Sequence, residues 1–221
     1  MLFANSLVQL FLRGGPIMWP ILVVAIVSLA IVGERIVWWI RENARRDPAR
    51  LEKVLAALEN GDFADAARHS KGSQDPVIRM IWHGLNHVNA SMQGALQVAA
   101  GAEIKRAGRF LMVMDTCITV APLLGLLGTV TGIMGAFANV GGELAIEGVS
   151  AGIGEALIAT AAGLGIAIFN LLPFNYLTER VGKLQFELET AATNIEVMVN
   201  KAKAEGFDTV EFRRQVAAQN S

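Results

Sequence analysis

Residues 152–170 read GIGEALIATAAGLGIAIFN, an apolar run that carries one carboxylate, Glu155, near its start and one hydroxyl, Thr160, near its middle. No residue from Ala156 to Thr178 is charged, and about 20 mostly apolar residues are enough for a helix to cross a bilayer. A carboxylate beside such a run is costly in lipid unless it faces a protein interior or a wet cavity. The stretch therefore predicts a membrane helix with a functional polar face.

Two further runs are long and apolar enough to span a membrane. Residues 16–33 carry no charge, and Trp38 and Trp39 beyond them suit the aromatic belt at a membrane surface. Residues 116–142 are also free of charge. The whole chain of 221 residues is 53% hydrophobic with a mean hydropathy of +0.43, which is high for a soluble protein. The sequence therefore predicts an integral membrane protein with three spans.

Lysine and arginine are unevenly distributed around the three predicted spans. Arg13 alone precedes the first span, whereas several basic residues follow it, among them Arg35, Arg41 and Lys53. The loop between the second and third spans has no basic residue. Because basic residues near the ends of spans favour the cytoplasmic side, the sequence predicts an N-terminus outside and a C-terminus inside.

The predicted fold is all-α, with three transmembrane helices in the lipid bilayer and long helices that extend into the cytoplasm. Its parts, in chain order, are an external segment (1–15), a first transmembrane helix (16–40), a cytoplasmic helical domain (41–109), a second transmembrane helix (110–140), a short external loop (141–149), a third transmembrane helix (150–177) and a cytoplasmic helical tail (178–221). We expect a symmetric homo-oligomer, because the second and third spans present more small-residue surface than one chain can bury.

Helix signals mark the two predicted cytoplasmic parts. Asp47-Pro48 and Asp75-Pro76 each pair a capping carboxylate with a proline at the first helical position, and Asp62 begins another helix. Apolar residues recur every three or four positions from Val181 to Met198, which indicates a helix that packs on a neighbour through one apolar stripe. We expect a kink or a local opening of the third span at Pro173.

Other candidate chemistry in the chain is weak. His83 and His87 lie four residues apart on one predicted helix, a spacing that could hold a metal. No carboxylate or cysteine nearby completes a site, so we expect packing or surface roles, no metal and no cofactor. The single cysteine, Cys117, lies in an apolar run and is expected to be buried and unreactive. A net charge of −1 gives no indication of nucleic acid binding.

The second and third predicted spans are rich in small residues at helical spacing. The residues that we expect to pack helices together are Gly125, Gly128, Gly132, Ala159 and Gly163. Such stripes let helices approach closely in lipid, and the pair at 128 and 132 is a GxxxG match. The alternative is that these spans do nothing but pack, with Thr129 and Thr160 bonded to their own backbone carbonyls.

Glu155 favours a function beyond packing. A carboxylate in a membrane span usually marks an ion or proton pathway, although one near the end of a span can also reach the outer headgroups. No aspartate, lysine or histidine lies within the three charge-free runs. Because nothing there could form a proton relay with Glu155, a proton pathway through this chain would be incomplete in the chain alone.

Two stretches of the chain resemble the signature membrane helices of the MotA/TolQ/ExbB proton-channel family. They are APLLGLLGTVTGIMGAF (Ala121–Phe137) and GIGEALIATAAGLGIAI (Gly152–Ile168). The resemblance is closest to the ExbB/TolQ branch. Members of that branch share the three predicted spans, their orientation, the helical domain between the first two spans (41–109) and the helical tail (178–221). The motor-stator branch has four spans, which argues against MotA itself. The sequence departs from the family at Ser150–Gly154, where relatives carry a proline before the glutamate.

The resemblance implies a homopentamer in a bacterial inner membrane, with the second and third spans lining a central pore. It also implies that the pore holds the single membrane helices of an ExbD/TolR-like partner, whose aspartate takes up protons. Thr129 and Thr160 would face that aspartate, and Glu155 would be a further polar residue of the lining. Proton flow would then energise a TonB- or TolA-like protein that acts on the outer membrane, in import or biopolymer transport.

Three other classes of function stay open. A non-conducting oligomeric scaffold needs only small-residue packing. A solute carrier is disfavoured because the chain lacks an internal repeat or a pair of interrupted helices. An enzyme is disfavoured because no nucleophile–base pair, metal cluster or phosphate loop occurs in the sequence. A neighbouring gene for a single-span protein with a membrane aspartate would favour the channel over the scaffold.

Overall fold

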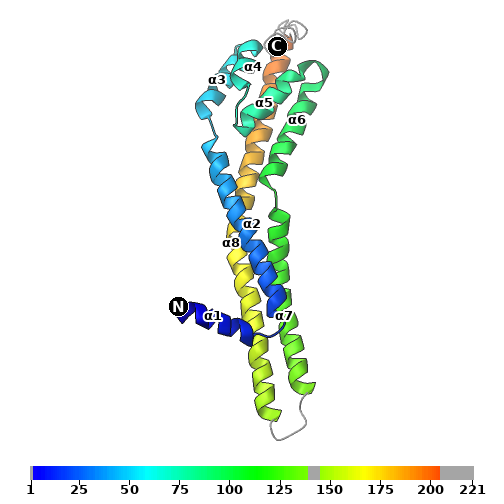
Figure 1. Ribbon diagram of the computed structural model, residues 1–221. Coiled ribbons are helices and arrows are strands. Elements are labelled where there is room, and N and C mark those ends of the chain that lie inside the picture. The colour runs from blue at the N-terminus through cyan, green and yellow to red at the C-terminus, as the bar shows by residue number, and fades with distance from the viewer. Residues whose placement is uncertain (1, 139–144, 205–221) are drawn as a thin grey trace. The chain divides into compact units, whose positions relative to one another are not determined.

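The computed structural model describes residues 2–138 and 145–204 (Figure 1). Every regular element in these two ranges is an α-helix, and no strand occurs in them. The helices are α1 (Leu2–Arg13), α2 (Met18–Ala44), α3 (Pro48–Glu59), α4 (Phe63–Ser70), α5 (Pro76–Asn86), α6 (Val88–Ala107), α7 (Leu111–Ala138) and α8 (Ala145–Ala204). The predicted all-α class is therefore confirmed for the described residues.

The chain divides into two compact units. Unit 1 contains Met1–Ile36 and Phe110–Leu177, and unit 2 contains Val37–Arg109 and Thr178–Ser221. The helices α2 and α8 contribute residues to both units. Phe110, between α6 and α7, has a φ of 66°, an uncommon backbone conformation for a bulky side chain.

Three helical stretches are long and apolar enough to cross a membrane, as the sequence predicts. They are Met18–Ala44, a stretch that ends with α7 at Ala138, and a stretch of α8 that begins at Val149. An 18-residue segment within each has a mean hydropathy of 2.2, 2.0 and 1.9, respectively. The helix α2 continues to Ala44, four residues beyond the predicted end of the first span at residue 40. The extent of the span in the membrane stays a prediction.

Two segments at the predicted outer side differ from the sequence-based expectation. The segment 1–15 contains the helix α1, which the sequence patterns did not indicate, and α1 lies crosswise to the part of α8 in unit 1 (Figure 1). The predicted loop 141–149 lies partly outside the described residues, and from Ala145 onwards it belongs to α8.

The helix α8 is a single element of 60 residues. It includes Pro173, and the kink or local opening that the sequence predicts there stays a prediction. The predicted apolar stripe of the tail lies on this helix, and its Leu184, Leu188 and Ile195 are buried in the core of unit 2. The neighbour that the stripe requires is therefore supplied by the same chain.

The three predicted helix starts in unit 2 are confirmed. The carboxylates of Asp47, Asp62 and Asp75 each accept a hydrogen bond from a backbone N–H two or three residues further on, at 3.0, 2.9 and 2.8 Å respectively. At the other end of α3, Asn60 caps the helix and Gly61 has a φ of 75°. The hydrogen bonds to the three aspartates satisfy N–H groups that a helix leaves unpaired at its start.

Large apolar side chains make the core of unit 2. The helix α5 buries Ile78, Met80 and Ile81, and α8 contributes Leu188 and Ile195 to the same cluster. Burying each side chain of this size contributes about 1.5–3 kcal/mol relative to leaving it in water. Helices α3 to α6 therefore form a packed helical domain with the α8 residues of unit 2.

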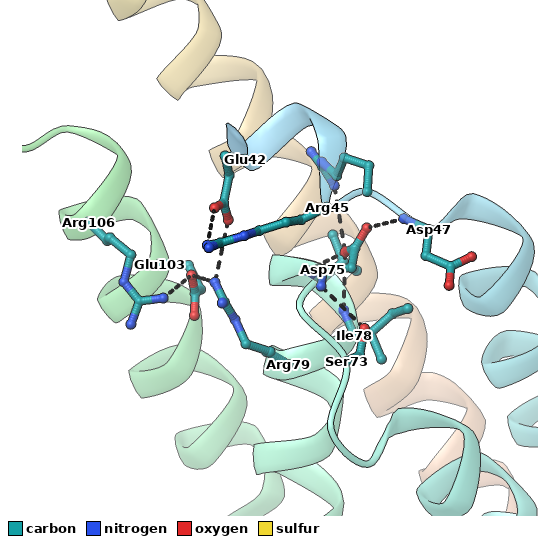
Figure 2. Close-up of polar contacts among 11 residues, drawn as sticks. Glu42, Arg45, Asp47, Ser73, Asp75, Ile78, Arg79, Glu103 and Arg106 are labelled. Atoms are coloured by element: carbon teal, nitrogen blue, oxygen red, sulfur yellow. Dashed lines mark hydrogen bonds and ion pairs between the residues drawn. The ribbon is translucent and has the colours of Figure 1, made fainter. Parts of the chain in front are cut away.

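A network of ion pairs joins α2, α5 and α6 within unit 2 (Figure 2). The Nη2 atom of Arg79 lies 2.5 Å from Glu103 Oε2 and 3.5 Å from Glu42 Oε1. Arg45 and Arg106 pair with the same two glutamates, each at 3.5 Å. Glu42 is 3% exposed and Glu103 is 9% exposed. The three guanidinium groups therefore balance two carboxylates that would be costly to bury alone.

Candidate functional site

The helices α7 and α8 approach so closely in unit 1 that their contact requires glycine. A Cβ atom at Gly125 would lie 2.9 Å from Thr160 Cα and 3.1 Å from Ala159 O. A Cβ atom at Gly163 would overlap the carbonyl oxygen of Ala121 and lie 3.1 Å from its carbon. Backbone atoms cannot move aside as a flexible side chain can, so a larger residue at either position would push the helices apart.

Gly128 and Gly132 continue the same contact along α7. A Cβ atom at Gly128 would lie 2.7 Å from the Cβ of Ala159, and one at Gly132 would lie 3.0 Å from the Cβ of Ala156. All five residues predicted to pack helices therefore lie between α7 and α8 of one chain: Gly125, Gly128, Gly132, Ala159 and Gly163. Within one chain, α8 already covers the small residues of α7. That these residues also form contacts between copies of the chain stays a prediction.

The two candidate threonines differ in their hydrogen bonds. Thr160 Oγ1, on α8, lies 2.9 Å from Gly125 O of α7 and 3.2 Å from Ala156 O of its own helix, so its proton is shared between two carbonyls. Thr129 Oγ1 donates to Leu126 O on its own helix at 2.6 Å. Both residues are partly exposed. Each hydroxyl oxygen keeps a lone pair that could accept a hydrogen bond from a protonated group on another protein.

Glu155 points away from the hydroxyl of Thr160. Its carboxylate lies against Gly15, in the turn between α1 and α2, where the side chain of any other residue would begin. If Gly15 carried a Cβ atom, that atom would overlap the carboxylate and lie 2.9 Å from Glu155 Cγ. Five residues separate Glu155 from Thr160, which is about 140° around an α-helix. The structure therefore brings Thr160 to the α7–α8 contact and Glu155 to the α1–α2 turn. That Glu155 lines a lumen shared between copies stays a prediction.

A second polar contact in the apolar helices was missed by sequence reasoning. Asn170 of α8 is fully buried, and its Nδ2 donates to Ser28 Oγ of α2 at 3.0 Å and to Ile166 O at 2.7 Å. Its Oδ1 has no hydrogen-bond partner among the described residues. The signal was present, since an amide within a membrane span commonly forms a hydrogen bond to a neighbouring helix.

The two histidines show no sign of a metal site. His83 and His87 are exposed, and His87 Nδ1 lies 2.8 Å from His83 O. Across residues 2–138 and 145–204, no three side chains of the types His, Cys, Asp and Glu gather as metal ligands would. A chain without a bound metal stays the expectation from the sequence.

Comparison with known proteins connects these helices to a family. A model of the MotA/TolQ/ExbB proton channel family matches residues 72–190, which is more than half of the chain. The match includes all of α7 and the part of α8 that carries Glu155 and Thr160. A Synechocystis protein described as biopolymer transport protein ExbB-like 1 is 37% identical over 179 residues, 76% of this chain and 68% of that protein.

Two other relatives match over shorter stretches. Biopolymer transport protein ExbB of Neisseria gonorrhoeae is 42% identical over 85 residues, 38% of this chain and 39% of that protein. The Tol-Pal system protein TolQ of Haemophilus influenzae is 39% identical over 93 residues, 41% of each chain. With its three apolar helices, the chain is a multi-pass membrane protein that belongs to the ExbB branch of the MotA/TolQ/ExbB proton channel family.

Proposed function

We propose that this chain is the ExbB/TolQ-like subunit of a proton channel or motor in the bacterial inner membrane. The observation that carries the proposal is the placement of Thr129 and Thr160 on α7 and α8. Each offers a hydroxyl oxygen on a largely apolar part of its helix, inside the stretch that matches the proton channel family. Hydroxyl groups of this kind can exchange hydrogen bonds with a carboxyl group as it gains and loses a proton.

The proposed assembly is a homopentamer around a central pore, with the N-terminus outside and the C-terminus in the cytoplasm. The distribution of lysine and arginine supports this orientation. The exposed apolar side chains of α7, among them Leu127, Val130 and Met134, support contacts with lipid or with other helices. Because the charge-free runs hold no aspartate, the proton-carrying group comes from an ExbD/TolR-like partner with a single span in the pore.

Proton flow through this complex energises a TonB- or TolA-like protein that acts on the outer membrane, without catalysis by the chain. The names of the relatives support this role, since two are biopolymer transport proteins and one belongs to a Tol-Pal system. The energy released by proton flow would drive import or biopolymer transport.

A non-conducting scaffold is the second candidate, and one observation favours it. Thr129 and Thr160 both donate to backbone carbonyls, as hydroxyls do in helices that only pack. On this alternative the hydroxyls stabilise the α7–α8 pair and have no part in proton transfer.

The test compares Thr129→Ala and Thr160→Ala in the chain co-produced with an ExbD/TolR-like protein that has one membrane span and a membrane aspartate. Thr131→Ala is the matched control, because Thr131 also donates to carbonyls of α7, at 2.9 Å to Leu127 O, but lies on another face of the helix. Proton flux into vesicles and growth that depends on the coupled system are measured at equal membrane levels. We expect both candidate variants to lose flux and the control to keep it.

Removing one hydroxyl that bonds only to backbone costs on the order of 1 kcal/mol or less, so an assembled variant without flux requires a functional explanation. Glu155→Gln should be milder or dependent on pH, because the amide still forms hydrogen bonds but cannot titrate. Normal flux in both threonine variants would reject the pore role of Thr129 and Thr160, and absence of flux in the unmutated complex would favour the non-conducting scaffold.

A further inference from the structure

Two glycines in the turn between α1 and α2 face α8. Gly14 is buried, and a Cβ atom there would lie 3.1 Å from Ile158 Cγ2. At Gly15 the carboxylate of Glu155 occupies the place of a Cβ atom. Glu155 and Ile158 are three residues apart and therefore lie on one face of the helix. The turn thus packs on the face of α8 that carries the carboxylate.

Glycine is required at position 15 for two separate reasons. The φ of Gly15 is 72°, in the left-handed region that residues with a side chain rarely adopt, and its carbonyl accepts a hydrogen bond from Met18 N at 3.1 Å at the start of α2. Gly61 and Gly72 have similar φ values of 75° and 73°, but nothing lies within 4 Å of a Cβ atom at either. Of these three glycines, only Gly15 also makes room for a charged group.

The surrounding packing holds this turn in place. Ala159 of α8 is fully buried in a cluster with Met18 of α2. A Cβ atom at Gly128 of α7 would lie 2.7 Å from Ile17 Cγ2, just before α2. The start of α2 is therefore held against both α7 and α8, and the turn cannot withdraw from Glu155 without losing these contacts.

We propose that Gly15 is a positioning residue for Glu155, which sets the direction of the carboxylate by leaving room for it against the α1–α2 turn. The inference rests on the proposed function, in which Glu155 belongs to the proton pathway. The contact keeps the carboxylate out of lipid, where it would be costly, and near the first turn of α2, whose dipole favours negative charge. The turn before the first span thereby takes part in the pathway, although the second and third spans form the proposed pore.

The geometry of the contact is tested without measuring proton flow. Glu155 Cγ lies 2.9 Å from a Cβ atom at Gly15, and one more C–C bond of about 1.5 Å places the two Cβ atoms at most about 4.4 Å apart, within the range of a disulfide. The Gly15→Cys/Glu155→Cys variant, in a Cys117→Ala background, should therefore form a disulfide within one chain when membranes are oxidised. Gly15→Cys/Leu157→Cys is the control, because Leu157 is 61% exposed on another face of α8.

The expected result is loss of maleimide labelling in the test pair alone, with no dimer band on a non-reducing gel. A disulfide that joins two copies, or equal labelling of the test and control pairs, overturns the positioning role whatever the flux.

The second test measures proton flux in the complex with its single-span partner. Gly15→Ala should lower flux on the order of tenfold to a hundredfold, the effect that a misplacement of about 1 Å has on a reacting group. Gly61→Ala imposes the same backbone strain in unit 2 and should leave flux unchanged. Adding Glu155→Asp to Gly15→Ala withdraws the carboxylate by one methylene and should restore flux to the level of Glu155→Asp alone.

Rescue by the shorter carboxylate separates positioning from a purely structural need for glycine. If the double variant loses as much flux as Gly15→Ala, the positioning role is wrong. If Thr129→Ala and Thr160→Ala lose flux while Gly15→Ala does not, the proposed function stands and the inference about Gly15 falls. If the unmutated complex conducts no protons, the proposed function itself falls and the inference falls with it.

Discussion

Units 1 and 2 use the same long helix, α8, in opposite ways. In unit 1, α8 packs on its neighbours through small residues such as Ala159 and Gly163, while the larger Leu164 is 47% exposed. In unit 2, α8 packs through large apolar residues, and Leu188 and Ile195 are fully buried. One helix therefore carries two different packing rules along its length.

The difference follows from the two solvents that a membrane protein meets. In water, the transfer of large apolar side chains into a core drives packing. In lipid, a leucine gains nothing from leaving its surroundings, so helices associate through close backbone approach and hydrogen bonds. Polar groups do not divide as cleanly, since unit 1 has the neutral bonds Thr160–Gly125 and Asn170–Ser28 and also a buried arginine, Arg35, paired with Glu34.

The largest effect on stability should come from Arg79→Ala in unit 2. The substitution removes the guanidinium between Glu42 and Glu103, and breaking a buried pair typically costs about 3–5 kcal/mol. The measurement is denaturant unfolding of the full chain in detergent, with hydrogen exchange of α5 and α6. Arg68→Ala is the control, because Arg68 pairs with Asp65 on the surface at 66% exposure and such pairs contribute about 0–1 kcal/mol. Equal losses in both variants would contradict the importance of the network.

The next effect should come from Gly163→Ala in unit 1. The added methyl group overlaps the carbonyl of Ala121, and overpacking of this kind costs about 1–3 kcal/mol. Gly165→Ala lies two residues away with nothing within 4 Å of its Cβ atom, so it should be neutral or stabilise the helix by up to about 1 kcal/mol. Thermal unfolding in detergent compares the two. A loss in both variants, or in neither, would mean that close backbone approach does not hold unit 1 together.

A smaller effect is expected at the helix starts of unit 2. Asp75 is 2% exposed and accepts bonds from Val77 N at 2.8 Å and from Asp47 N at 3.1 Å, so it serves two helix starts. Asp75→Ala should cost about 1–2 kcal/mol, at the upper end of the range for an N-cap. Asp62→Ala removes the hydrogen bond from Asp65 N at one helix start and should cost less. A larger loss from Asp62→Ala in the same unfolding measurement would reverse this ranking.

The features that the sequence predicted correctly are those with local signals. An aspartate before a helix caps it whatever the rest of the chain does, so Asp47, Asp62 and Asp75 marked three starts. The apolar stripe from Val181 to Met198 likewise showed its buried face by its spacing alone. Three long charge-free runs gave the candidate spans for the same reason.

The features that the sequence did not predict are contacts between distant residues. Nothing near Gly15 indicates that Glu155 lies against it, because the contact depends on how the α1–α2 turn packs on α8. The pair Ser28 and Asn170 is separated by 142 residues and was missed for the same reason. The small-residue stripe was found, but the sequence could not tell that Gly132 meets α8 of its own chain and not another copy.

The smallest effect should separate the two threonines by stability alone. Thr160 donates across the helix contact to Gly125 O, whereas Thr129 donates only within α7. Hydrogen bonds between membrane helices are worth about 0.6 kcal/mol on average and up to about 1.7 kcal/mol. Thr160→Ala should therefore cost about that much, and Thr129→Ala about zero, since a bond to the preceding turn of its own helix adds little. Unfolding of both variants in detergent, without the partner protein, measures the difference. If the two variants unfold alike, the bond to Gly125 contributes nothing to the α7–α8 contact, and the closeness of the glycines alone holds these helices together.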